Sequence, residues 1–151
     1  MADSSTLAPR GAKGLGIALL VAAAITVAYW VIWFGVDRTL LASAHTDAYY
    51  AFENSFPLAD AWLALSALVG GVLLIRGNPN AIYWAFLAAG SGIYLGLMDV
   101  LFDLENGIYI GKGGGDPSAP AIEIGINILT FALSGVGLWW AWRNRRWAAK
   151  A

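Results

Sequence analysis

Long apolar stretches alternate with short polar ones along the chain. Four of these stretches match the roughly 20 residues that a helix needs to cross a bilayer core of about 30 Å. They cover about residues 14–36, 56–75, 81–103 and 120–142. The pattern predicts an all-α integral membrane protein in which a four-transmembrane-helix bundle, spanning 1–151, forms a single transmembrane domain.

Composition supports this interpretation and removes several function classes. Hydrophobic residues make up 59% of the 151 residues and charged residues 13%, and the mean hydropathy is +0.63, a balance that a soluble domain of this size could not hide from water. The absence of cysteine removes thiol–disulfide chemistry and thiolate metal sites, and the single histidine argues against a bis-histidine haem. Nothing in the chain suggests nucleic acid as a partner, because no basic patch is interleaved with aromatic residues away from the membrane interface.

The first apolar stretch also resembles a signal peptide, because Arg10 and Lys13 precede it and the sequence ASA at 42–44 resembles a cleavage site. The stretch is too long for that role, and Asp37 and Arg38 separate it from the ASA sequence. We therefore expect the first helix to be retained.

Basic residues gather on one side of the predicted membrane. Seven of the nine basic residues, but only Asp3 of the ten acidic ones, fall on that side. The seven are Arg10, Lys13, Arg76, Arg143, Arg145, Arg146 and Lys150. Because short cytoplasmic loops are enriched in Lys and Arg, we expect both termini in the cytoplasm (N-in/C-in) and a location in the plasma (inner) membrane.

The outer ends of the helices suggest an internal repeat. SFPLAD at 55–60 and SAPAIE at 118–123 share the pattern S-x-P-x-x-acid, and each opens the second helix of a hairpin, so the bundle is predicted to contain two similarly oriented helical hairpins. Convergence on favourable helix starts explains the pattern as well as duplication does. The outer segment 38–56 is expected to place a short aromatic helix along the membrane surface, and 111–120 is predicted to be flexible.

Carboxylates occur on the same helix faces as small residues. Asp99 and Asp103 lie about 40° apart on a stripe of Gly and Ala, and the helix rise of about 1.5 Å per residue puts both near the outer surface. Similar stripes run below Asp60 in the second helix and below Glu123 and Asn127 in the fourth. Because membrane helices pack through small residues, these acids are predicted to face the bundle interior. The predicted ligand-binding residues of this outward-facing acidic site are Asp60, Asp99, Asp103, Glu123 and Asn127.

Two interpretations of these acids stay open from sequence. Carboxylates at the interface can simply be solvated, and Asp103, Glu105 and Asp116 are each expected to reach water. Alternatively, close acids in a low dielectric are either protonated or neutralised by a cation. If a cation neutralises the acids, Asp99 and Glu123 are the residues predicted to bind it. The cation is then a hard divalent metal ion such as Ca²⁺ or Mg²⁺, or an organic amine.

The predicted function is binding of a cation or cationic small ligand, with transport as an extension. One alternative is an accessory or structural subunit of a membrane protein assembly. The other is a membrane-embedded acid–base enzyme acting on a lipid or isoprenoid, with Asp99 and Glu123 as its pair. An enzyme is disfavoured because the sequence offers no nucleophile constellation or cofactor motif. Expected partners are the lipid bilayer and either another membrane protein or a second copy of the chain, the latter through GIYLG at 92–96.

Overall fold

The computed structural model describes residues 7–149, and this part of the chain is helical without a β-strand. Asp3 and Lys150, both assigned to the cytoplasmic side from sequence, lie outside it. The α-helices are α1 (Ala12–Ile32), α2 (Asp47–Glu53), α3 (Pro57–Ile75), α4 (Ala81–Asn106), α5 (Ala119–Arg143) and α6 (Arg145–Ala148). A π-helix, η2 (Trp33–Asp37), and a 3-10 helix, η3 (Arg38–Leu40), extend α1, and a second 3-10 helix, η4 (Ile108–Ile110), follows α4.

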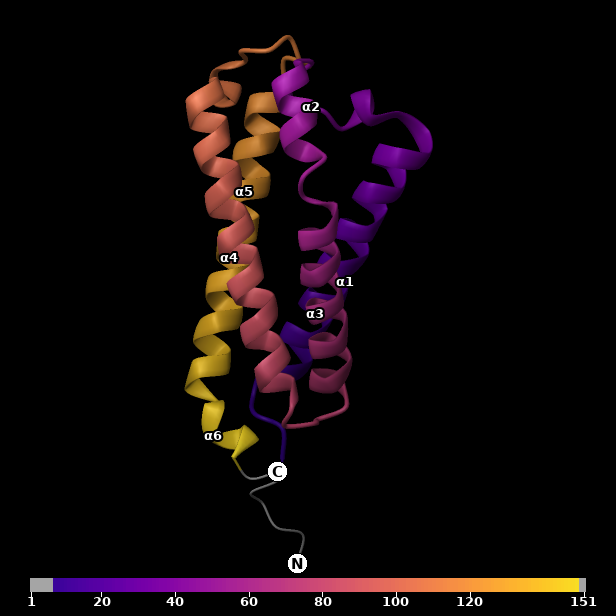
Figure 1. The fold of residues 1–151 in the computed structure, drawn as a ribbon. Coiled ribbons are helices and arrows are strands. Elements are labelled where there is room, and N and C mark those ends of the chain that lie inside the picture. The colour runs from indigo at the N-terminus through magenta and orange to yellow at the C-terminus, as the bar shows by residue number, and fades with distance from the viewer. Residues whose placement is uncertain (1–6, 150–151) are drawn as a thin grey trace, which may run out of the picture.

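Four helical segments in the described range are long and apolar enough to cross a membrane. They contain α1, α3, α4 and α5, each within a few residues of a predicted span, and this supports an integral membrane protein. Figure 1 shows them as an elongated bundle in which α1 begins and α5 ends at the same end. The packing order is α1 on α3, α3 on α4 and α4 on α5.

Helix boundaries follow from local chemistry. Prolines occupy the first turns of α3 and α5, where the missing N–H costs nothing because it would have no intrahelical partner. Gly107 ends α4 in the left-handed conformation, with φ of 69°, and its N–H bonds the Asp103 carbonyl. This glycine stop keeps Asp103 inside the last turn of the helix.

Small residues create the helix contacts, as the stripes predict. A Cβ atom at Gly71 would lie 2.8 Å from the Gly16 carbonyl oxygen, so α1 and α3 approach at backbone distance. Gly92 lies against the Ser134 hydroxyl, and Gly96 against Phe131. The GIYLG glycines therefore pack α4 on α5 within the chain, and pairing with a second copy of the chain stays a prediction.

The outer loops fold over the bundle. The predicted surface helix exists as α2, but it does not lie flat, because Phe52 stacks on Phe102 of α4 with ring centroids 3.8 Å apart and Tyr49 is buried. Ala44 forms a β-bridge with Gly114, and the His45 N–H donates to the Gly113 carbonyl over 2.8 Å. Segment 111–120 is thus held by the first outer loop, which the sequence alone did not indicate.

The outer end of α1 is joined to the segment that follows it by three aromatic donors. The Tyr29 hydroxyl donates to Glu53 over 2.9 Å, the Trp30 indole N–H to Asp60 over 2.9 Å, and the Trp33 indole N–H to the Asn54 side chain over 3.0 Å. Each bond pairs an amphipathic ring with a polar group close to the start of α3. These bonds fix α1 against α2 and α3 at the level of the predicted acidic site.

Candidate functional site

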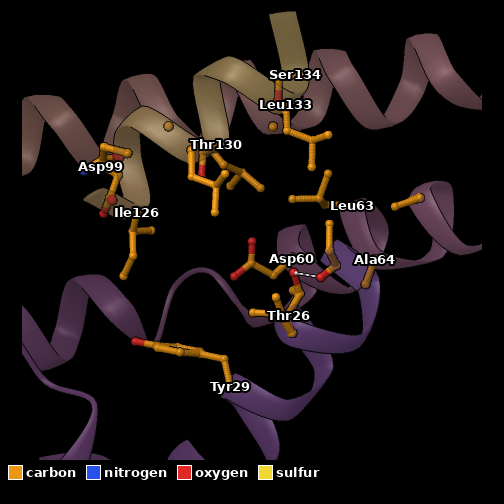
Figure 2. Close-up of a pocket in the computed structure, with 18 of the residues that line it drawn as sticks. Thr26, Tyr29, Asp60, Leu63, Ala64, Asp99, Ile126, Thr130, Leu133 and Ser134 are labelled. Carbon is orange, nitrogen blue, oxygen red and sulfur yellow. Dashed lines mark hydrogen bonds between the residues drawn. The ribbon is translucent and has the colours of Figure 1, made fainter. Parts of the chain in front are cut away.

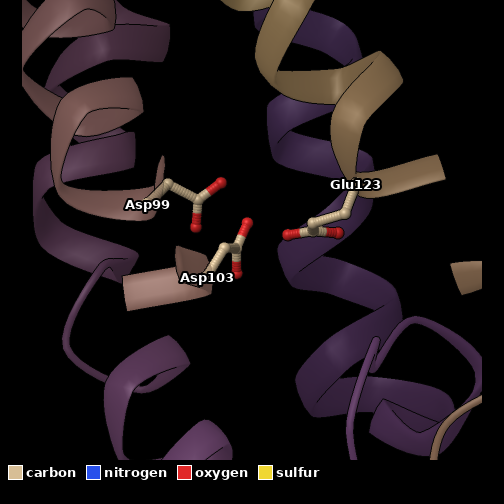
Figure 3. Close-up of side chains that lie close together, drawn as sticks. All are labelled: Asp99, Asp103 and Glu123. Atoms are coloured by element: carbon tan, nitrogen blue, oxygen red, sulfur yellow. The ribbon is translucent and has the colours of Figure 1, made fainter. Parts of the chain in front are cut away.

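Three carboxylates from α4 and α5 converge at the outer end of the bundle. Asp99 and Asp103, one turn apart on α4, and Glu123, in the first turns of α5, each offer an oxygen, and these oxygens lie within 4.8 Å of one another. Figure 3 shows the three carboxylates directed toward a common space. Asp103 is 1% exposed and Glu123 6%. Negative charges this close repel strongly in a low dielectric.

Few donors serve this acidic cluster. The Ser43 hydroxyl, from the first outer loop, donates to Glu123 over 2.7 Å. The Asn127 amide donates to one oxygen of Asp103 at 3.3 Å and to the Tyr109 hydroxyl at 3.0 Å. The other oxygen of Asp103, Oδ1, is buried with no hydrogen-bond partner. A buried carboxylate oxygen without a donor carries the full cost of its lost hydration.

A cavity of about 350 Å³ extends from Asp99 and Glu123, which line it, toward the end of the bundle at which α1 begins. Asp103 is not among its lining residues. Asp60, Asp99, Glu123 and Glu53 contribute to its lining, and its other walls are largely apolar. In Figure 2, Asp60 and Tyr29 lie across the cavity from Asp99, and Leu133 and Ser134 lie farther along it. The cavity therefore has acids at two places, Asp99 with Glu123 and Asp60 across from them, and its remaining walls are largely apolar.

No basic residue neutralises these acids from within the described cavity, whose lining contains no Lys, Arg or His. Of the two basic residues predicted on the outer side, Arg38 places its guanidinium 4.3 Å from the centre of the Tyr50 ring, and Lys112 is exposed. Carboxylate and amide oxygens without a protein cation are the donor set that hard metal ions and ammonium groups prefer. This arrangement can therefore coordinate a cation.

The structure brings together four of the five predicted site residues. Asp99, Asp103, Glu123 and Asn127 are neighbours, and Asp103 joins the predicted pair Asp99 and Glu123 as a third potential metal ligand. Asp60 lies apart from the three-acid cluster, where it lines the cavity and accepts the Trp30 bond.

One expectation about solvation is wrong. Asp103 was expected to reach water at the rim, but the Tyr109 and Asn127 side chains and the overlying loops leave it almost fully buried. The outer loops likewise cover Glu123, so the acids do not rim an open outward-facing mouth. Glu105 and Asp116 are exposed, as expected.

Sequence reasoning missed four contributors: Glu53, Ser43, Tyr109 and Tyr29. Glu53 is a fourth acid at the cavity, 8% exposed and bonded by Tyr29. All except Tyr29 belong to outer segments, whose fold is set by contacts distant in sequence. The one local signal was the aromatic-rich stretch YYAFE at 49–53, which is typical of a segment that packs rather than of a solvated loop.

Two groups outside the spans show how the loop environment acts on ionisation. Burial, together with the negative charge of Asp103, raises the pKa of Tyr109, which therefore stays a neutral partner for Asn127. Hydrogen bonds from the Ser118 hydroxyl and backbone N–H lower the pKa of Asp116. Asp116 is thus an ordinary exposed turn carboxylate, in contrast to the buried cluster.

Comparison of the chain with protein-family models, with curated proteins and with solved structures finds no match. The function is therefore argued from the residues of the site.

Proposed function

We propose that the protein binds a cation or cationic small ligand at the acidic cluster of Asp99, Asp103 and Glu123. The observation that carries this proposal is the buried Asp103 Oδ1, which has no hydrogen-bond partner beside two further carboxylates. A cation in this space would supply the missing partner and relieve the repulsion among the three acids. The residues around the cluster would act by holding it in place, Ser43 through Glu123 and Asn127 through Asp103.

We further propose that the bundle lies N-in/C-in in the plasma membrane as two similarly oriented hairpins. The side on which basic residues gather supports this orientation. The acidic cluster would then lie near the outer surface, as the sequence predicts. An acid-lined cavity supports a ligand-binding role over the alternative of a purely structural subunit.

The test measures thermal unfolding of the purified protein in detergent with Ca²⁺, Mg²⁺, Mn²⁺, Na⁺ or methylammonium. A cation that binds only the folded state, present at a concentration 100 times its Kd, adds about 2.7 kcal/mol to the unfolding free energy. We expect Asp103→Asn to abolish this increase and Glu105→Gln, at an exposed acid of the same helix, to retain it. Protons compete for the carboxylates, so the increase should shrink as the pH is lowered.

Without a ligand, Asp103→Asn should melt no lower than the parent, because it removes one of three repelling charges. A cation that stabilises Asp103→Asn as much as the parent would place its binding elsewhere. No stabilisation by any of these cations would contradict the proposed function.

A further inference from the structure

The cavity below the acidic cluster has a marked division of chemistry. Asp99 and Glu123 line it at the acidic cluster and Asp60 at a second place, while helices α1, α3, α4 and α5 line most of the rest with Ala, Leu and Ile and only a few hydroxyl groups. A hydrated metal ion would contact only the acidic region, and its binding would not explain an apolar volume of this size. A pocket of roughly 300 Å³ or more with a few polar groups at one place is typical of a site for an organic ligand.

Helices α1 and α5 both line the cavity but do not pack closely on each other, so we infer that the cavity opens sideways between them. Its walls on α3 and α4 are buried, as in Ala67 and Ala85, which are 2% and 1% exposed. Its walls on the other two helices are exposed apolar side chains, including Ile25 at 61% and Leu129 at 64%. Because these side chains face the region that a bilayer would fill, the opening leads to lipid.

The outer loops cover the route from the aqueous side. Ser43 reaches over the cavity to Glu123. The buried ring of Tyr49 and the backbone bridge between Ala44 and Gly114 lie in the same covering layer. A ligand of this cavity is therefore best supplied from within the membrane, where it is already partitioned.

The charged group of such a ligand can be specified. The acidic cluster offers carboxylate oxygens as acceptors, and two of its acids, Asp99 and Glu123, line the cavity. A protonated primary amine supplies three N–H donors to these oxygens as well as charge, whereas a quaternary ammonium donates no hydrogen bond. Tyr29 and Tyr49 also line the cavity and add aromatic surface to its walls.

We propose that the ligand is a membrane-partitioned primary amine with a single apolar chain, its ammonium at Asp99 and Glu123, where the acidic cluster meets the cavity, and its chain in the apolar part of the cavity. This proposal rests on the proposed function, because it gives a chemical class to the cation of that same cluster.

The experiment measures binding in nanodiscs of zwitterionic lipid by thermal unfolding. The probes are methylamine, octylamine, dodecylamine, dodecyltrimethylammonium and dodecanol. The test variant is Ala22→Leu, which fills part of the cavity from α1, and its matched control is Ala24→Leu, at an exposed position of the same helix that does not line the cavity. Both variants experience the same bilayer, so partitioning of the long-chain probes is the same for the two proteins.

We expect the parent and Ala24→Leu to bind dodecylamine more tightly than methylamine. Ala22→Leu should bind dodecylamine roughly tenfold more weakly than the parent does. Methylamine should bind all three proteins alike, Asp103→Asn should lose both amines, and dodecanol and the quaternary amine should bind poorly. If Ala22→Leu and Ala24→Leu bind dodecylamine with equal affinity, the gain from the alkyl chain comes from the bilayer and not from the cavity, and the proposal is overturned. Dodecanol or the quaternary amine binding as well as dodecylamine would also overturn it.

The outcomes separate this proposal from the proposed function. Binding of methylamine or a metal ion that depends on Asp103, with no gain from the chain, would leave the cation site in place and remove the amphiphile. Absence of Asp103-dependent binding by every cation would remove both.

Discussion

Asn127 is the residue on which the order of the acidic cluster depends most directly. Its amide nitrogen bonds both Asp103 and Tyr109, so one side chain of α5 positions a carboxylate of α4 and a hydroxyl of η4. Asn127 is itself 5% exposed, which leaves water little room to replace it. A buried amide shared between two partners holds more structure than either bond alone would.

Asn127→Leu should therefore destabilise the fold. The substitution keeps a similar side-chain volume but removes the Asn127 amide that donates to Asp103. The loss should cost about 1 to 3 kcal/mol in unfolding free energy. Unfolding of the detergent-solubilised protein by a denaturing detergent measures this loss. In an Asp103→Leu background the same substitution should cost less, because no carboxylate is left without a donor; an equal cost in both backgrounds would contradict this account.

At the scale of elements, the contact between α1 and α3 depends on the absence of side chains. Gly16 and Gly71 face each other across it, and the Leu20 side chain also packs at Gly71. A side chain at position 71 would have no room, because the Gly16 carbonyl and the Leu20 side chain both belong to α1 and lie against Gly71. Gly90, on α4, provides the contrast, since a Cβ there would meet nothing within 4 Å.

Gly71→Ala should accordingly lower the unfolding free energy by about 1 to 3 kcal/mol through overpacking. Gly90→Ala, the same chemical change at an open helical position, should not lower it and should raise it by up to about 1 kcal/mol, because Ala favours the helix. Parallel thermal melts of the two variants make the comparison. Similar losses for both would mean that glycine is needed for a reason other than the packing of α1 on α3.

For the whole molecule, the orientation in the membrane is open to a direct test. The chain contains no cysteine, so single substitutions provide unique labels. Ser55→Cys, in the link between α2 and α3, should react with a membrane-impermeant thiol reagent on intact cells, whereas Arg76→Cys, between α3 and α4, should react only after permeabilisation. Both positions are exposed, so a difference reports sidedness. The reverse pattern would invert the proposed N-in/C-in orientation.

The helices of this molecule could be predicted closely from sequence, because hydropathy fixes spans and the helical period fixes faces. That is why the small-residue stripes of α3, α4 and α5, and the closeness of Asp99, Glu123 and Asn127, could be predicted from the sequence. The burial of Asp103 and the roles of Ser43 and Glu53 were not. These depend on how the outer loops fold back, and loops carry no periodic pattern that relates residues 43 and 123.

The bond between Trp30 and Asp60 has an optical consequence. It joins the indole N–H of a fluorescent side chain to a carboxylate that lines the cavity. Indole emission responds to charge and polarity around the ring, so a ligand that enters the cavity near Asp60 would change the light that Trp30 emits. Since the chain contains eight tryptophans, the difference in emission between the parent and Trp30→Phe isolates this signal, and occupancy of the cavity can then be followed without attaching a dye.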